Sequence, residues 1–149
     1  MKHTFLLFSL VALFCGSCRS MEAAAEQSSQ SDKVKLGIEV LLTREPGGTY
    51  LAEEIRRLIK DQETDAPCDR SELLLFLAAR AQLVRTVIEP ALAAGRWVVS
   101  DRFSDSTLAY QGYGRGMSLD FIASANAFAC EGLKPDLTLL LDVSPETAQ

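Results

Sequence analysis

Two residues at the end of an apolar run are the first candidates for chemistry. The run from Trp97 to Ser100 is followed at once by the acid Asp101 and the base Arg102. Such a run is typical of a buried parallel strand, and ligands in open α/β sheets bind beyond the carboxyl ends of the strands. Asp101 can hold Mg²⁺ through water, and Arg102 can bind a phosphate through two hydrogen bonds. The alternative is an ordinary ion pair at the end of a strand.

A second candidate pair lies on a predicted helix. Phe76 and Arg80 are four residues apart and therefore share a helix face. An aromatic ring beside a guanidinium can stack on a planar base and hydrogen-bond its edge. The alternative, which the residues alone favour, makes Phe76 a core residue and Arg80 a surface charge. Arg44 ends another predicted strand before the glycine-rich turn 46–48, where the backbone can approach a phosphate.

Composition limits the function classes. A chain of 149 residues suits one domain with a proper core. The net charge of -5 argues against general nucleic-acid affinity, but a small phosphorylated ligand needs only a local positive cluster. The four cysteines are scattered and there is one histidine, so a zinc site of cysteine and histidine is not expected.

The N-terminal segment 1–31 has two interpretations. Its basic start, short apolar run and small residues before Cys18 resemble a secretory or lipoprotein signal. The alternative is a first buried strand over Phe5 to Leu13. The stretch from Met21 to Asp32 is rich in Ala, Glu, Gln and Ser and is typical of a linker or a weak helix.

The remaining elements alternate between strand and helix, which predicts a parallel α/β sheet. Ser71 and Ser118 are expected N-caps, and Pro90 should bend or end the helix that contains it. The predicted strands cover 37–43, 97–101 and 136–142, and the predicted helices cover 50–60, 71–93 and 119–131.

Several longer motifs then resemble one family. They are 43–49 (TREPGGT), 75–82 (LFLAARAQ), 100–103 (SDRF) with 106–112 (STLAYQG), and 135–143 (PDLTLLLDV). In order and spacing they are similar to bacterial thymidylate kinases, which belong to the P-loop nucleoside monophosphate kinases. The resemblance makes 32–149 a partial kinase domain. It implies an incomplete three-layer fold, a parallel sheet with flanking helices.

The same resemblance implies an activity and a set of roles. The reaction is phosphorylation of dTMP to dTDP with ATP and Mg²⁺, for dTTP biosynthesis, in a cytoplasmic homodimer. Asp101 and Arg102 would be catalytic, with Asp101 also organising Mg²⁺ through water. The residues implied to bind dTMP are Arg44, Phe76, Arg80, Arg102, Ser106, Thr107, Tyr110 and Gln111. In these roles Phe76 stacks on thymine, Arg80 bonds its edge, Arg102 holds the phosphate, and Tyr110 helps to exclude a ribose 2′-hydroxyl.

Two departures from the family pattern concern the ATP side. The family begins with a glycine-rich phosphate loop ending in Gly-Lys-Ser/Thr. Residues 26–31 stand in its place, with Ser28 and Ser29 as a remnant. The family also continues into a lid beyond residue 149. We therefore expect an altered gene start rather than an export signal, and an inactive dTMP-binding remnant is the alternative function. An exported or lipid-anchored protein is the alternative if residues 1–18 act as a signal.

Overall fold

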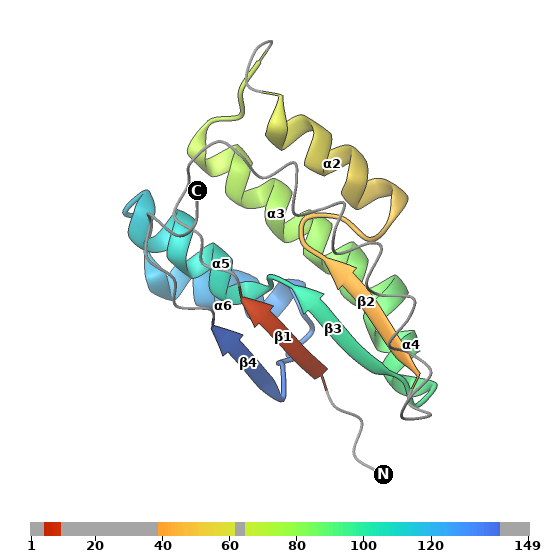
Figure 1. The fold of residues 1–149 in the computed structure, drawn as a ribbon. Coiled ribbons are helices and arrows are strands. Elements are labelled where there is room, and N and C mark those ends of the chain that lie inside the picture. The colour runs from red at the N-terminus through yellow and green to blue at the C-terminus, as the bar shows by residue number, and fades with distance from the viewer. Residues whose placement is uncertain (1–4, 10–38, 62–64, 141–149) are drawn as a thin grey trace, which may run out of the picture.

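Parallel strands form the centre of the molecule. The structure is a computed structural model that describes residues 5–9, 39–61 and 65–140. Within these residues the sheet has four parallel strands in the order β2-β3-β1-β4, so that β3 and β1 are the inner strands (Figure 1). The strands are β1 (Phe5–Ser9), β2 (Val40–Arg44), β3 (Trp97–Asp101) and β4 (Leu137–Leu140).

The strand β1 answers one of the open questions about the N-terminus. The alternative of a strand beginning at Phe5 is confirmed for Phe5–Ser9, which pairs in parallel with β3 on one side and β4 on the other. An apolar run suits this inner position because strands of parallel sheets are covered on both faces. Residues 10–38, which include Ser28 and Ser29, lie outside the described residues.

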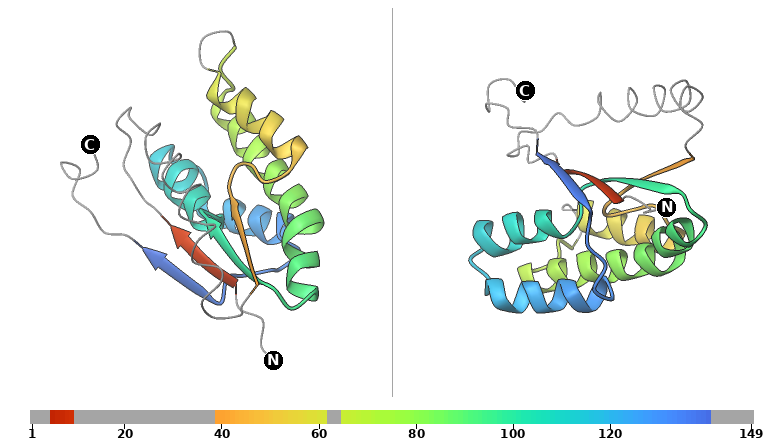
Figure 2. Two further views of the ribbon diagram at one scale, coloured as in Figure 1. Left: turned by 45° about the vertical axis from the view of Figure 1, so that its right-hand side comes forward. Right: turned by 90° about the horizontal axis from the view of Figure 1, so that it is seen from below.

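The helices are packed against this sheet. They are α2 (Tyr50–Lys60), α3 (Asp69–Leu83), α4 (Glu89–Ala93), α5 (Ser104–Thr107) and α6 (Leu119–Ala129), with π-helical segments η2 (Val84–Ile88) and η3 (Leu108–Gly114). In the right-hand view of Figure 2 these helices lie on one side of the sheet. The parallel sheet with flanking helices confirms the predicted α/β fold. None of the described helices is long and apolar enough to cross a membrane.

The predicted start of the long helix was two residues too late. Ser71 is not the N-cap, because α3 begins at Asp69 and Cys68 occupies the cap in an extended conformation. Asp69 and Glu72 both lie in the first turn, where negative charge is favourable. The Ser71 hydroxyl instead lies 3.2 Å from the Cys68 sulfur. The other predicted cap is confirmed, since Ser118 Oγ accepts a hydrogen bond from the Phe121 N–H.

Pro90 does not end its helix at once. The helical path runs without interruption through α3, η2 and α4 to Ala93, three residues beyond Pro90. In the turn that precedes the proline the helix widens, and the Glu89 N–H bonds Val84 five residues back. A proline removes one helical donor and crowds the preceding turn, so a local π-helical widening accommodates it.

Three small clusters make up the described core. The first joins β3 to η2 and α4, the second lies between α3 and α6, and the third lies between α2 and α3. Their buried residues are Leu83, Val84, Ile88, Ala91, Val98, Phe103 and Cys130 in the first, Leu73, Leu77, Ile122 and Ala129 in the second, and Ala52, Ile55 and Ala79 in the third. Because α3 contributes to all three clusters, its position and rotation are well fixed.

Candidate functional site

The carboxyl ends of β2 and β3 meet at one edge of the sheet. Arg44 and Asp101 are partners in the strand register, and the Glu45 N–H donates to the Asp101 carbonyl at 3.0 Å. The Asp101 residue is exposed, and Arg102 follows it half-buried. The two strand ends that the sequence singled out therefore lie side by side, as parallel pairing requires.

The turn after β2 is tied to the start of α2. Glu53 accepts a hydrogen bond from the Gly48 N–H at 2.9 Å, and its other oxygen lies 3.4 Å from Arg44 Nη2. Thr49 caps α2 by accepting from the Ala52 N–H at 3.1 Å. These contacts draw the Arg44 side chain back along the turn toward Glu53.

Arg80 lies at the centre of a buried polar network. Its side chain is 2% exposed. Its Nε donates to Glu45 Oε2 at 2.8 Å, and its Nη1 donates to Thr107 Oγ1 at 2.9 Å and to Asn126 Oδ1 at 2.6 Å. The guanidinium also lies 5.4 Å from the centre of the Phe103 ring. Three segments therefore converge on this cation of α3: the turn after β2, the segment from Phe103 to Thr107, and α6.

This geometry overturns the simpler alternative for Phe76 and Arg80. Arg80 is buried rather than a surface charge, and Phe76, one turn earlier on α3, is half-buried rather than a fully enclosed core residue. Arg80 is therefore a fixed, buried guanidinium, and Phe76 is a partly accessible ring; a base-binding role for the pair remains a prediction.

Sequence reasoning gave no role to two of the three residues that hydrogen-bond Arg80, namely Glu45 and Asn126. Glu45 lies inside the TREPGGT motif, and Asn126 lies on α6 between the apolar residues Ile122 and Ala129. An isolated amide on an otherwise apolar helix face is a signal that could have been noticed, because buried polar groups need partners. Neither the motif around Glu45 nor the isolated amide of Asn126 identifies Arg80 as the partner.

Two opposing electrostatic effects act on the pKa of the buried Glu45 carboxyl. Burial raises its pKa above the ordinary value of 4.5, and the charge and hydrogen bond of Arg80 act in the opposite direction. Removing a carboxylate from water is costly, so Arg80 is what allows an acid to occupy this position.

Several buried polar atoms around this network have no hydrogen-bond partner among the described residues. They are Thr43 Oγ1, Glu45 Oε1, Ser106 Oγ and Asn126 Nδ2. Glu45 and Asn126 bond Arg80 directly through their other polar atoms, and Ser106 precedes Thr107. Since an unsatisfied buried polar atom is unfavourable, this mixture of donors and acceptors suits a polar ligand.

Arg102 adopts an unusual backbone conformation. Its φ is 70°, in the left-handed region that favours glycine. Its guanidinium carbon lies 5.6 Å from the centre of the Tyr110 ring, within the range of a cation–π contact. The structure therefore brings together Arg102 and Tyr110, two residues that the resemblance places at the dTMP.

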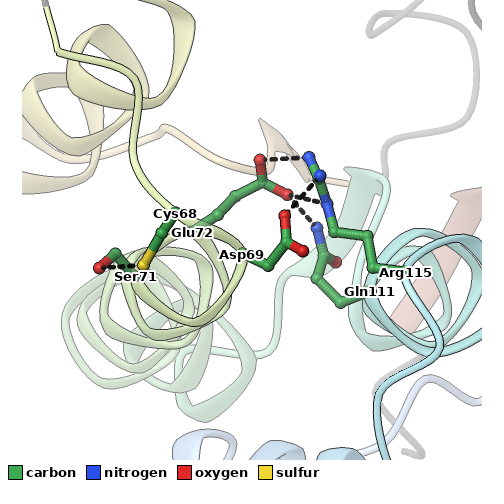
Figure 3. Close-up of polar contacts among 6 residues, drawn as sticks. All are labelled: Cys68, Asp69, Ser71, Glu72, Gln111 and Arg115. Atoms are coloured by element: carbon green, nitrogen blue, oxygen red, sulfur yellow. Dashed lines mark hydrogen bonds and ion pairs between the residues drawn. The ribbon is translucent and has the colours of Figure 1, made fainter.

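Gln111 belongs to a different cluster. Its amide Nε2 donates to Glu72 Oε1 at 2.7 Å, and Arg115 bonds both Glu72, at 2.7 Å, and Asp69, at 2.6 Å (Figure 3). These contacts fasten η3 and the following turn to the first turn of α3. The Gln111 amide nitrogen is thus committed to a protein contact, and π-helical segments such as η3 occur frequently at functional sites.

The two described cysteines differ in their thiol chemistry. The hydrogen bond with Ser71 lowers the pKa of the exposed Cys68 thiol, whereas burial raises the pKa of Cys130 to about 11. Among the described residues no group of three or more His, Cys, Asp or Glu side chains is arranged to hold a metal ion. Mg²⁺ does not need such a group, because it is commonly held by one or two carboxylates together with waters and substrate phosphates.

The comparisons with known proteins agree on one family. The family model for thymidylate kinase matches residues 33–149. A thymidylate kinase of Synechococcus sp. (strain RCC307) is 50% identical over 135 residues, which is 90% of this chain and 64% of that protein. A thymidylate kinase of Chromohalobacter salexigens is 57% identical over 114 residues, covering 76% of this chain and 54% of that protein.

A solved structure gives the same result for the fold. The crystal structure of thymidylate kinase from Ehrlichia chaffeensis superposes with a TM-score of 0.73 at 36% identity, over 95% of this chain and 76% of that one. The present chain spans about 64% of the length of the Synechococcus relative. With the motifs in order, the fold and the matched family model, the chain belongs to the thymidylate kinase family.

Proposed function

We propose that the protein phosphorylates dTMP to dTDP with ATP as the donor. One observation carries this proposal beyond family membership. Arg80 is a buried, fully oriented guanidinium on α3 that bonds Glu45 in the turn after β2, and Arg102 is a half-buried guanidinium directly after the neighbouring strand β3. A nucleoside monophosphate has two ends that suit such a pair, a polar base edge and a phosphate.

The base would be held on the Arg80 side. Phe76 offers a ring for stacking. Arg80 Nη2 lies 2.7 Å from Glu45 Oε2, and its second N–H is the donor offered to a base oxygen. Nη1 is already occupied by Thr107 and Asn126, so the fork has little freedom to turn. Ser106 Oγ adds a buried hydroxyl without a partner among the described residues, and a pyrimidine edge can supply one.

The sugar and phosphate would lie toward Arg102. Arg102 would hold the phosphate of dTMP through two hydrogen bonds, and the Tyr110 ring beneath its guanidinium would lie next to the deoxyribose. Gln111 would support this side through its contact with Glu72. Arg44, drawn toward Glu53, would lie near the acceptor phosphate.

The reaction joins an oxygen of the dTMP phosphate to the γ-phosphorus of ATP as the bond between that phosphorus and the β,γ-bridging oxygen breaks. Catalysis of this kind is mainly positioning and neutralisation of charge. Mg²⁺ neutralises charge on the ATP phosphates when bound, and the exposed Asp101 carboxylate is an oxygen ligand suited to hold it through water. Arg102 would keep the attacking phosphate oxygen in place.

The test of this proposal combines turnover and binding. A coupled assay with ATP, Mg²⁺ and dTMP should release ADP only when dTMP is present. Phe76→Ala should weaken binding of dTMP and of thymidine alike, by about 10- to 100-fold, because stacking on a base contributes about 1–3 kcal/mol. Isothermal titration calorimetry measures both affinities.

The matched control is Tyr50→Ala, which removes an aromatic ring that is 85% exposed at the start of α2. It should leave both affinities unchanged. Absence of ADP release above the level without dTMP would contradict the proposed phosphoryl transfer. Equal binding of thymidine by the parent protein and Phe76→Ala would remove Phe76 from the site.

We also propose that the protein forms a homodimer through α3 and α6 and acts in the cytoplasm, where ATP is supplied. Phe121 and Phe128 are seven residues apart on one face of α6 and are 57% and 86% exposed. Leu74 on the adjacent α3 is 60% exposed. A second copy of the same face would bury these side chains in a self-complementary contact.

Phe128→Asp should therefore weaken dimerisation at least tenfold, because a carboxylate would be buried in the apolar contact. Sedimentation velocity over a concentration series measures the change. Tyr50→Asp, at an equally exposed aromatic on α2, should sediment as the parent protein does. A parent protein that remains monomeric at all concentrations would contradict the dimer.

A further inference from the structure

Ser100 is a buried hydroxyl that neither the motif roles nor the proposed mechanism uses. It is 0% exposed and lies near the end of β3, in register with Leu7 of β1 and Thr43 of β2. Its Oγ donates to the carbonyl oxygen of Arg102 at 2.8 Å. Because β3 is paired with a strand on each side, the donor is fixed, and the bond anchors the peptide that follows Asp101.

The anchored residue has a backbone that an arginine rarely adopts. Its φ of 70° is strained for a residue with a side chain, and such a conformation persists only when its surroundings hold it. The sharp turn at Arg102 sends the side chains of Arg102 and Phe103 to different surroundings. Phe103 enters the core at 0% exposure against Arg80, while Arg102 stays half-buried over Tyr110.

We propose that Ser100 is a positioning residue for the phosphate contact of Arg102, an inference that rests on the proposed binding of dTMP. Without the hydroxyl, the backbone at Arg102 is free to relax toward negative φ, which turns the side chain away from the Tyr110 ring. The base end of the site, around Arg80, does not depend on this bond. Loss of Ser100 should therefore affect the phosphate of the ligand and not its base.

The experiment compares dTMP with thymidine, which has the same base and sugar but no phosphate. Titration calorimetry on the full chain gives the preference for dTMP as the ratio of the two dissociation constants. Ser100→Ala should reduce this ratio about tenfold and leave the affinity for thymidine within twofold of the parent. Arg102→Ala should abolish the preference. Ser124→Ala, which deletes a hydroxyl-to-carbonyl bond within α6, should change neither affinity.

A ratio that stays within twofold of the parent in Ser100→Ala, while Arg102→Ala abolishes it, would overturn the role of Ser100 and leave the proposed function intact. Equal losses for thymidine and dTMP would show a general structural role and also overturn it. If Ser100→Ala does not fold, Ser100→Cys keeps the volume with a weaker donor and should lower the ratio about threefold; an unchanged ratio there refutes the inference. If the parent protein shows no preference for dTMP, the proposed function fails first.

Discussion

Replacing Arg80 by methionine is expected to lower the free energy of unfolding by about 3–5 kcal/mol at pH 7, the usual cost of removing one partner of a buried ion pair. The side chains of Arg80 and Glu45 are 2% and 4% exposed, and their closest atoms are 2.7 Å apart. Methionine fills much of the volume but leaves the Glu45 carboxylate without a countercharge. Urea denaturation followed by circular dichroism measures the loss.

The loss in Arg80→Met should also depend on pH. Burial already raises the pKa of Glu45 above 4.5, and the two opposing effects both come from Arg80. Removing Arg80 therefore raises this pKa further. A folded-state pKa above the unfolded value means that the folded state binds more protons, so stability is fully present below about pH 4.5 and is lost as the pH rises through the folded-state pKa. The variant should be closer to the parent at pH 5 than at pH 7.

Two comparison variants isolate the cause. Arg80→Met combined with Glu45→Gln should regain more than half of the lost stability at pH 7, because no charge remains buried. Arg57→Met breaks the ion pair with Glu54, whose side chains are 67% and 44% exposed, and should cost less than about 1 kcal/mol. A loss in Arg80→Met that is the same at pH 5 and pH 7 would show that the carboxylate is not responsible.

Gly48→Ala is expected to destabilise the protein by about 2–4 kcal/mol, through overpacking added to backbone strain. A Cβ at this position would lie 2.5 Å from Thr43 Oγ1 and 2.7 Å from Leu83 Cδ1, and Leu83 is fully buried in the core. The φ of Gly48 is 81°, which a residue with a side chain rarely adopts. Thermal and urea unfolding give the change.

Gly116→Ala separates the two causes. Gly116 also has a positive φ, of 68°, but a Cβ there would meet nothing within 4 Å. Its substitution should cost only about 1 kcal/mol, the conformational part alone. Equal losses at the two positions would mean that the contact with Leu83 is relieved by a small shift and that the close approach of the turn to the core is unimportant.

The order of elements could be predicted well from local patterns. The helix Tyr50–Lys60 and the strand Trp97–Asp101 were placed correctly, because helical and strand periodicities are properties of neighbouring residues. The beginning of α3 was misplaced because Ser71 is a good cap by composition. The extended conformation of Cys68, three residues before Ser71, decided the cap instead.

The N-terminal apolar run shows a second limit. A signal sequence and an inner parallel strand have the same composition, so Phe5–Ser9 could not be assigned from its residues. The pairing of Phe5–Ser9 with both β3 and β4 is a tertiary contact, which composition alone cannot reveal.

By itself the sequence determined the α/β class, the family motifs and the charged residues at the ends of the strands, Arg44, Asp101 and Arg102. It could not determine which side chains hold Arg80, since Glu45 and Asn126 are 35 and 46 residues away from it along the chain. Only packing of α6 and the turn after β2 against α3 brings these groups within hydrogen-bond distance. Tertiary structure likewise decided the strained turn at Arg102, because the hydroxyl that anchors it is held between two neighbouring strands. Periodicity is local, whereas burial and the partners of a buried charge depend on the whole fold.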